Sequence, residues 1–173
     1  MTTETIPRSG WASFVWSRYA PLALAVTIAT VAADQLHKWW MLSVYDIAAK
    51  GRVEVFPFLD LVYVKNIGIS YSLLNQESIL GQYLLMAFAV FASICLWLWL
   101  NRAASGKLMA IGLALIIGGA IGNAIDRLRL GGVADFFSLH VFGYHWYVFN
   151  IADVAIVAGV VALLYESFFK ESH

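Results

Sequence analysis

The chain has 173 residues, of which 61% are hydrophobic and only 13% charged, and its formal net charge is zero. This balance is far from that of a soluble globular protein, and a neutral chain offers no basic face to nucleic acid. The single cysteine, Cys95, excludes an internal disulfide framework. Length and composition therefore predict one integral membrane domain over residues 1–173.

The first apolar segment follows a polar stretch that carries Arg8 and Arg18. Residues 19–33 are uncharged, and with their extension to residue 40 they can form a helix across the hydrocarbon core, which needs about 20 residues. We therefore expect a first span at residues 19–40. A cleaved signal peptide is the alternative, because Val31-Ala32-Ala33 resembles a small-residue cleavage site. Cleavage would leave three spans, with the later aspartates still on one side.

Residues 41–78 form the longest polar interval and contain no span. Residues 52–56 alternate between polar and apolar types, and residues 59–64 are rich in β-branched and aromatic types. These patterns predict two short strands, and hence a small sheet lying on the membrane surface. The uncharged run that follows predicts a second span at residues 79–100.

Two more apolar runs predict spans at residues 108–126 and 151–169, separated by a second outer loop at residues 127–150. In the third span a small-residue face, on which another helix can pack closely, is formed by Gly118, Gly119, Ala120 and Gly122. Gly131 and Gly132 are expected to interrupt regular structure, which would place Asp135 in a loop or bend.

Arg102 and Lys107 bracket a short loop without acidic residues. By the positive-inside rule this loop and the arginine-bearing N-terminus are cytoplasmic. Four spans then place both chain ends in the cytoplasm and the two longer loops outside.

Polar groups from five segments map to the outer membrane boundary under this topology, and they are Asp34, Asn66, Asp126, Asp135, Asn150 and Asp153. Charged side chains at a bilayer are costly, so such a cluster indicates a functional site. Two neighbouring carboxyls that share one proton can activate a water for attack on a peptide carbonyl and then protonate the leaving amine.

Spacing alone leaves open which two of the three late aspartates form this pair. Asp126 precedes Arg127 directly and lies one turn after Asn123, which favours a structural ion pair or hydrogen bond at a helix end. Asp135 has no adjacent cation. Asp153 lies at the start of a helix, where a carboxylate is stabilised.

Other chemistries lack their sequence patterns. His37, His140 and His145 do not occur at metal-ligand spacing, so neither a metal nor another cofactor is expected. A G-x-S-x-G nucleophile motif is absent. A proton-coupled transporter would need acids at several depths, and here Glu166 is the only acid near the inner end of a span. A non-catalytic assembly protein, docking through residues 118–122, is the third alternative.

Several segments, in the same order along the chain, resemble the bacterial lipoprotein signal peptidases (signal peptidase II). The matching segments are Asp34-Gln35-Leu36-His37-Lys38-Trp39, Asn66-Ile67-Gly68 with Ser70-Tyr71-Ser72, residues 118–127, Val133-Ala134-Asp135-Phe136, and Phe149-Asn150-Ile151-Ala152-Asp153. Tyr71 stands where that family usually has Phe, and Ala134 where a second Val is common.

The resemblance implies an all-α membrane protein of four transmembrane helices with a small periplasmic β-sheet, or cradle, in the bacterial inner membrane. It implies a monomeric aspartic endopeptidase that cleaves prolipoproteins before a diacylglyceryl-modified cysteine, with membrane lipid as its surroundings. Asp135 and Asp153 are the implied catalytic pair, without a metal. The implied supporting residues are Asp34, Lys38, Asn66, Gly68, Asn123, Asp126, Arg127 and Asn150.

Overall fold

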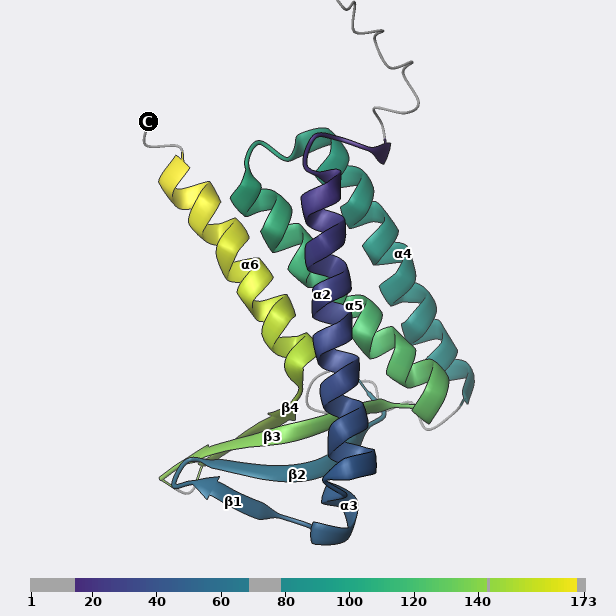
Figure 1. Ribbon diagram of the computed structural model, residues 1–173, viewed down its shortest axis with the longest axis vertical. Helices are drawn as coiled ribbons and strands as arrows, with labels where there is room; N and C mark the ends of the chain where they lie inside the picture. The colour runs from purple at the N-terminus through teal and green to yellow at the C-terminus, as the bar shows by residue number, and fades with distance from the viewer. Residues whose placement is uncertain (1–14, 69–78, 143, 171–173) are drawn as a thin grey trace, which may run out of the picture.

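The computed structural model describes residues 15–68, 79–142 and 144–170. Arg8 and the Ser70-Tyr71-Ser72 part of the resemblance lie outside the described residues. Within them, four long helices stand roughly side by side and a four-stranded sheet lies across one end of the bundle (Figure 1). This arrangement confirms the predicted fold class.

The four helices are long and apolar enough to cross a membrane. They are α2 (Ala20–Trp39, prolonged by the π-helical turn η1, Trp40–Val44), α4 (Ile79–Ala103), α5 (Lys107–Leu130) and α6 (Ile151–Lys170). Successive helices run in opposite directions, so the start of α2 and the end of α6 lie at the end remote from the sheet (Figure 1).

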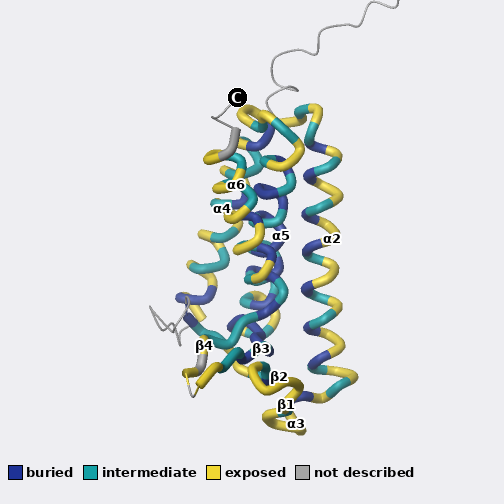
Figure 2. Tube along the Cα trace, turned by 90° about the vertical axis from the view of Figure 1, so that its left-hand side faces the viewer, coloured by how far each residue is buried: buried dark blue, intermediate teal, exposed yellow. Residues whose placement is uncertain are grey.

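Helix α5 is the centre of the bundle, because α2, α4 and α6 all pack on it. It is the most buried of the four, whereas much of α4 and α6 is exposed (Figure 2). The exposed residues of these two helices are largely apolar. Exposed Leu and Phe side chains along α4 suit lipid as the solvent, because apolar groups gain nothing by leaving hydrocarbon.

Glycines in α5 allow this close packing. A Cβ added at Gly118 would lie 2.7 Å from Cβ of Thr30 in α2, and one at Gly119 would overlap the carbonyl oxygen of Ala152 in α6. The predicted small-residue face is confirmed, and it serves two neighbouring helices rather than one.

Helix α5 continues to Leu130, four residues beyond the end expected from the sequence, so the outer loop does not begin at residue 127. Arg127 and Arg129 therefore lie in its last turn, where cations complement the helix dipole. Gly131 then ends the helix with a φ of 66°, and its N–H donates to the carbonyl of Arg127. The expected interruption at this glycine is confirmed.

The sheet has the strand order β1-β2-β3-β4, and all neighbours are antiparallel. Its strands are β1 (Val53–Phe56), β2 (Leu59–Asn66), β3 (Val133–Val141) and β4 (Tyr144–Phe149). The first two match the predicted strands. The last two were not predicted, and the expected loop position of Asp135 is wrong, because Asp135 lies within β3.

Strand β3 was not predicted from the sequence because both of its faces are buried at its start. Residues Val133 to Phe136 are all buried, so polar and apolar types do not alternate there. Phe136 packs with Met41 and Ile47, which belong to η1 and the short helix α3 (Ile47–Lys50). Since successive side chains of a strand point to opposite faces, Asp135 points away from this apolar cluster.

Candidate active site

Asn150 and Asp153 cap the start of α6 reciprocally. The backbone N–H of Asp153 donates to Oδ1 of Asn150 (3.0 Å), and the backbone N–H of Asn150 donates to Oδ2 of Asp153 (3.2 Å). This is the hydrogen-bond pattern of a capping box, which satisfies two N–H groups that a helix start leaves free. The cap fixes the Asp153 carboxylate at the sheet end of α6.

Asp135 is buried and receives an amide hydrogen bond at each carboxyl oxygen. Nδ2 of Asn150 donates to Oδ1 at 2.6 Å, and Nδ2 of Asn66 donates to Oδ2 at 3.1 Å. Asn66, the last residue of β2, also accepts the N–H of Gly68 on its Oδ1 (3.1 Å). The turn after β2 therefore fixes the amide that faces Asp135.

Asn123 of α5 connects the two carboxyls to the rest of the network. Its Nδ2 donates to Oδ1 of Asp153 (3.0 Å), while its Oδ1 accepts from Nδ2 of Asn150 and from Nζ of Lys38, both at 3.2 Å. Because both acceptor bonds reach the same oxygen, they fix which way the amide faces and so aim its N–H groups at Asp153.

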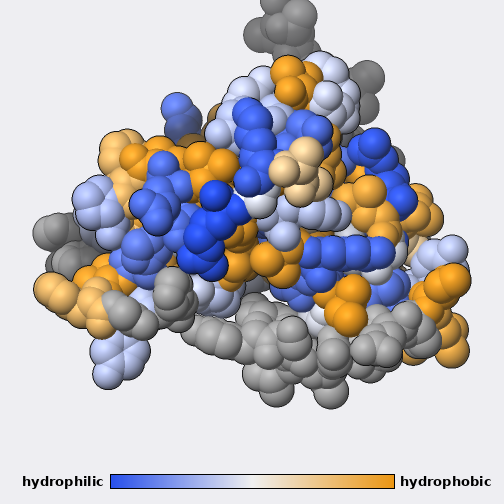
Figure 3. Space-filling model, turned by 90° about the horizontal axis from the view of Figure 1, so that it is seen from below, coloured by the Kyte–Doolittle hydropathy of each residue, from blue (hydrophilic) through white to orange (hydrophobic). Residues whose placement is uncertain are grey.

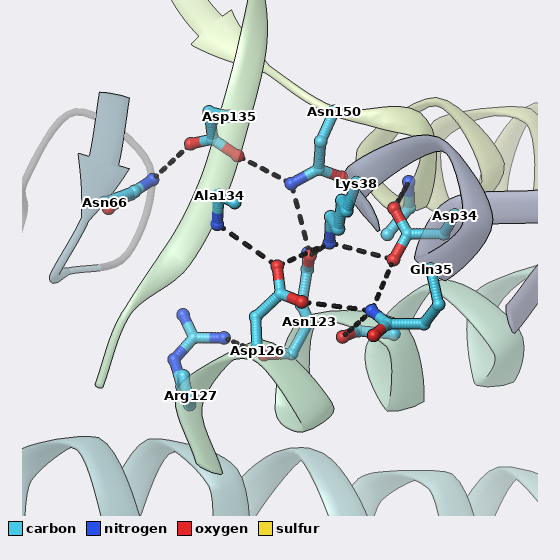
Figure 4. A network of polar contacts seen from close by, with 12 residues as sticks. Asp34, Gln35, Lys38, Asn66, Asn123, Asp126, Arg127, Ala134, Asp135 and Asn150 are labelled. Carbon is cyan, nitrogen blue, oxygen red and sulfur yellow. Dashed lines mark hydrogen bonds and ion pairs between the residues drawn. The ribbon is translucent and has the colours of Figure 1, made fainter. Parts of the chain in front are cut away.

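Lys38 lies at the centre of a buried ion cluster (Figure 4). Its Nζ is 2.8 Å from Oδ2 of Asp34, one turn earlier in α2, and 2.7 Å from Oδ2 of Asp126 in α5. All three side chains are almost fully buried. Asp34 and Lys38, at positions i and i+4 of one helix, therefore form an ion pair. The structural ion pair expected for Asp126 is also present, although its partner is Lys38 and not the neighbouring Arg127.

The two carboxylates of this cluster also accept hydrogen bonds from backbone N–H groups of other elements. Oδ1 of Asp34 accepts the N–H of Ala152 at the start of α6 (3.0 Å), and Oδ2 of Asp126 accepts the N–H of Ala134 in β3 (3.1 Å). Residues next to Asp153 and Asp135 in the chain are thus tied to the same ion cluster. Gly122 makes room for it, since a Cβ there would lie 2.6 Å from Oδ2 of Asp34.

Gln35 belongs to the site but was not predicted as a site residue. Its Nε2 lies within hydrogen-bond distance of Oδ2 of Asp34 (3.1 Å), Oδ1 of Asp126 (3.0 Å) and the Gly122 carbonyl (3.2 Å). Gln35 could have been predicted, because it lies inside the first segment that resembles the family. It was left out because its side chain is neutral and its neighbours Asp34 and Lys38 are charged.

Arg127 adds a cation to the site. Its Nη2 donates to the carbonyl of Gly68 (3.2 Å) and its Nη1 to the carbonyl of Asn123 (3.3 Å), while no residue of the described ranges is a hydrogen-bond partner of the buried Nε. The guanidinium therefore keeps its Nε–H as a donor that no described residue uses.

A cavity of about 160 Å³ lies where these elements meet, and both carboxyls line it. Its lining consists of Asn66, Gly68, Asn123, Arg127, Val133, Asp135, Tyr147, Val148 and Asp153. Nine of the ten residues predicted for the site line this cavity or belong to the ion cluster behind it, and the tenth, Asn150, hydrogen bonds to Asp135 and Asn123. Tyr147 and Val148 were missed, since β4 itself was not predicted.

Burial first, and then the nearby carboxylate of Asp153, raise the pKa of Asp135 to about 7, against the opposing effect of the amide hydrogen bonds. A carboxyl with this pKa keeps a proton near neutral pH and can act as an acid. No group of three or more His, Cys, Asp or Glu side chains within the described ranges is placed to hold a metal ion. His37 instead stacks on Phe137, with 5.2 Å between ring centroids.

Two carboxyls share a small cavity at the end of an apolar four-helix bundle, an arrangement suited to an aspartic peptidase of the membrane. Residues 26–169 match the family model described as signal peptidase (SPase) II. The chain therefore belongs to the signal peptidase II family, and it is a multi-pass protein of the bacterial inner membrane.

Relatives and solved structures agree with this assignment. The lipoprotein signal peptidase of Methylocella silvestris is 51% identical over 86% of this chain and 86% of its own length. That of Rhodopseudomonas palustris (strain CGA009) is 52% identical over 85% of this chain and 93% of its own. A bacterial membrane enzyme solved by the in meso method has a TM-score of 0.75 and 26% identity, and the match covers 88% of this chain and 90% of that one.

Proposed function

We propose that this peptidase removes signal peptides from prolipoproteins by cleaving before a diacylglyceryl-modified cysteine. The observation that carries the proposal is the shared cavity of Asp135 and Asp153, in which Asn150 contacts both side chains. The lipoprotein signal peptidases that the chain resembles at about half of its positions support the substrate class.

The pair works with one proton between its two carboxyls. Asp153, ionised, takes a proton from a water in the cavity as the water oxygen attacks the scissile carbonyl carbon. Asp135, protonated because of its raised pKa, gives its proton to the developing oxyanion. When the tetrahedral intermediate collapses and its C–N bond breaks, Asp153 passes the proton that it took from the water to the leaving amine, and Asp135 recovers its proton from the hydroxyl that becomes the new carbonyl oxygen. The products are one carboxylic acid and one amine, and a single water is consumed.

Asn123, Asn150 and Asn66 are positioning residues in this mechanism, because they hold the carboxyl oxygens in place. Arg127 has a different role. Its side chain lines the cavity, so its guanidinium is suited to hydrogen bond the substrate backbone.

Substrate reaches the cavity from the lipid. The apolar helix of a signal peptide and two acyl chains both partition into the bilayer, so the scissile bond arrives at the membrane boundary. Helices α4 and α6 both pack on α5 rather than closely on each other, so we expect the substrate to enter laterally between them. Strand β4 is an edge of the sheet, and an extended peptide can pair with it beside Tyr147 and Val148.

We infer an orientation with both termini in the cytoplasm and the site on the periplasmic side. Arg102 and Lys107 lie at the end of the bundle opposite the sheet, in agreement with the positive-inside rule (Figure 1). A reporter enzyme fused to the C-terminus should be active only in its cytoplasmic form. Activity of a reporter that works only in the periplasm would reverse the topology.

The substrate assignment is tested with purified protein, reconstituted without other enzymes, and two peptides of one sequence. One peptide carries a diacylglyceryl cysteine and the other an unmodified cysteine. Mass spectrometry should find cleavage at the bond before the cysteine, with the unmodified peptide cut more than about tenfold more slowly, because it lacks the acyl chains that hold it at the membrane. Equal rates, or cleavage at another bond, would overturn the assignment.

A further inference from the structure

The two hairpin turns of the sheet carry a group of exposed aromatic side chains away from the cavity. We call this group the aromatic tip, and its members are Phe56, Phe58, Phe142, Tyr144 and Trp146. Each is more than half exposed, from Phe58 at 51% to Phe142 at 98%. Pairing of Leu59 with Leu139 brings the two turns to the same end of the sheet.

The tip is one continuous surface. Phe56 stacks on Phe58, with 5.7 Å between ring centroids. Phe58, Phe142, Tyr144 and Trp146 line one shallow apolar cavity of about 490 Å³. Contiguous exposed apolar surface of this kind marks an interaction site.

Phe142 adds an independent observation. Its φ is 50°, in the left-handed region that a bulky side chain rarely adopts and that glycine or asparagine occupies with less strain. If this position served only to form the turn, a small or polar residue would therefore fit it better than Phe. Its ring is nevertheless the most exposed large apolar side chain of the described residues, so the position is used to present an aromatic ring outward.

The surroundings of the tip indicate what it contacts. Strand β4 leads into α6 through a single residue, Asn150, and α6 exposes Val154 and Val157 in its first two turns. The tip thus continues the apolar surface that the bundle presents to lipid. Residues 136–152 contain no Asp, Glu, Lys or Arg, so no permanently charged side chain of the second hairpin opposes its entry into a bilayer.

The shape of the molecule also indicates that the aromatic tip contacts the membrane. The hairpin turns project past the bundle on the side of α6 (Figure 1), and apolar side chains lie at the corresponding margin when the molecule is viewed from the sheet end (Figure 3). Trp39 and Trp40, exposed at the sheet end of α2, suit the aromatic belt of a membrane interface. Tyr and Trp in the tip are the residue types of that belt.

We propose that the aromatic tip inserts into the interfacial layer of the leaflet on the sheet side and anchors the sheet to the bilayer. Strand β3 connects this anchor to the cavity, since Asp135 lies six residues before Val141, about 20 Å along a strand. The strand that carries Asp135 would then be attached to the membrane at its far end as well as to the ion cluster at its near end. This proposal does not depend on the substrate or on the catalytic roles.

The depth of the tip can be measured with a nitroxide label. The full chain would carry Cys95→Ser and Phe142→Cys, and it would be reconstituted in nanodiscs of phosphatidylcholine and phosphatidylglycerol. Ala49→Cys on the exposed face of α3 supplies a water reference, and Val157→Cys on α6 supplies a lipid reference. Power-saturation EPR then compares collisions with oxygen, which concentrates in lipid, and with a water-soluble nickel complex.

The label at position 142 should give an oxygen-to-nickel collision ratio several-fold above that at position 49 and approaching that at position 157. A ratio equal to that at position 49 would overturn the proposal. Spin–spin broadening between copies would instead assign the tip to a second copy of the chain, and a lipid-like ratio only after a diacylglyceryl peptide is added would assign it to substrate. Both of these outcomes also contradict the proposal.

Discussion

Asn150 donates a hydrogen bond of 2.6 Å from its side-chain amide to Oδ1 of Asp135, a residue 15 positions earlier in the chain. The same asparagine caps α6 through its backbone N–H and its Oδ1, and thereby fixes Asp153. One side chain therefore sets the relative placement of a strand acid and a helix acid. The relationship ties the sheet to the bundle at the point where the proposed chemistry takes place.

Cleavage should fall as pH rises above about 7, because Asp135 then loses the proton that the mechanism requires. The hydrogen bond from Asn66 favours the charged carboxylate and lowers the pKa of Asp135. Asn66→Ala should therefore raise that pKa and move the falling limb of kcat/KM to higher pH. Asn101→Ala, at the opposite end of the bundle, is the matched control and should leave the limb in place. A limb that stays fixed or moves to lower pH in Asn66→Ala would show that Asp135 is not the group responsible.

Lys38→Met should destabilise the fold by about 3–5 kcal/mol, the usual cost of leaving a buried charge without its partner. Here two buried acids, Asp34 and Asp126, would lose their cation. The measurement is chemical unfolding in a bilayer-like detergent. Lys107→Met, at an exposed position, is the control and should change stability by less than about 0.5 kcal/mol. Equal stability of the two variants would show that the ion cluster contributes little.

Gly119→Ala should separate α5 from α6 and lower stability by roughly 1–3 kcal/mol, because the new methyl group overlaps the carbonyl oxygen of Ala152. Cleavage should fall with it, since Ala152 is next to Asp153. Ala29→Val adds apolar volume on the exposed face of α2 and should be tolerated. The check is thermal unfolding followed by fluorescence. An unchanged transition in Gly119→Ala would mean that the helices are not in close contact there.

The bundle could be predicted from the sequence because membrane spans leave a strong signal in composition alone. The runs that became α2, α4, α5 and α6 are long, apolar and separated by charged residues. Strands β3 and β4 could not be recognised in the same way. Burial on both faces removed the alternation from β3, and the glycines before it suggested a loop.

The residues of the site could be predicted from the sequence, but the hydrogen bonds and ion pairs between them could not. The resemblance supplied Lys38, Asp126 and Arg127 without saying which of them pair. Local reasoning favoured a contact at the end of α5 for Asp126, whereas the buried Lys38 Nζ lies between Asp126 and Asp34. A side chain on another helix, 88 positions away, cannot be chosen by spacing within one helix.

The central claim is that Asp135 and Asp153 act together on one water. It is tested most directly by the cleavage rate of Asp135→Asn and Asp153→Asn on the diacylglyceryl peptide, with Asp46→Asn, at an exposed position outside the site, as the matched control. Each site variant should remain folded and lose cleavage by on the order of a thousandfold or more, while the control keeps the full rate. Turnover near the control rate in either folded site variant would contradict the account.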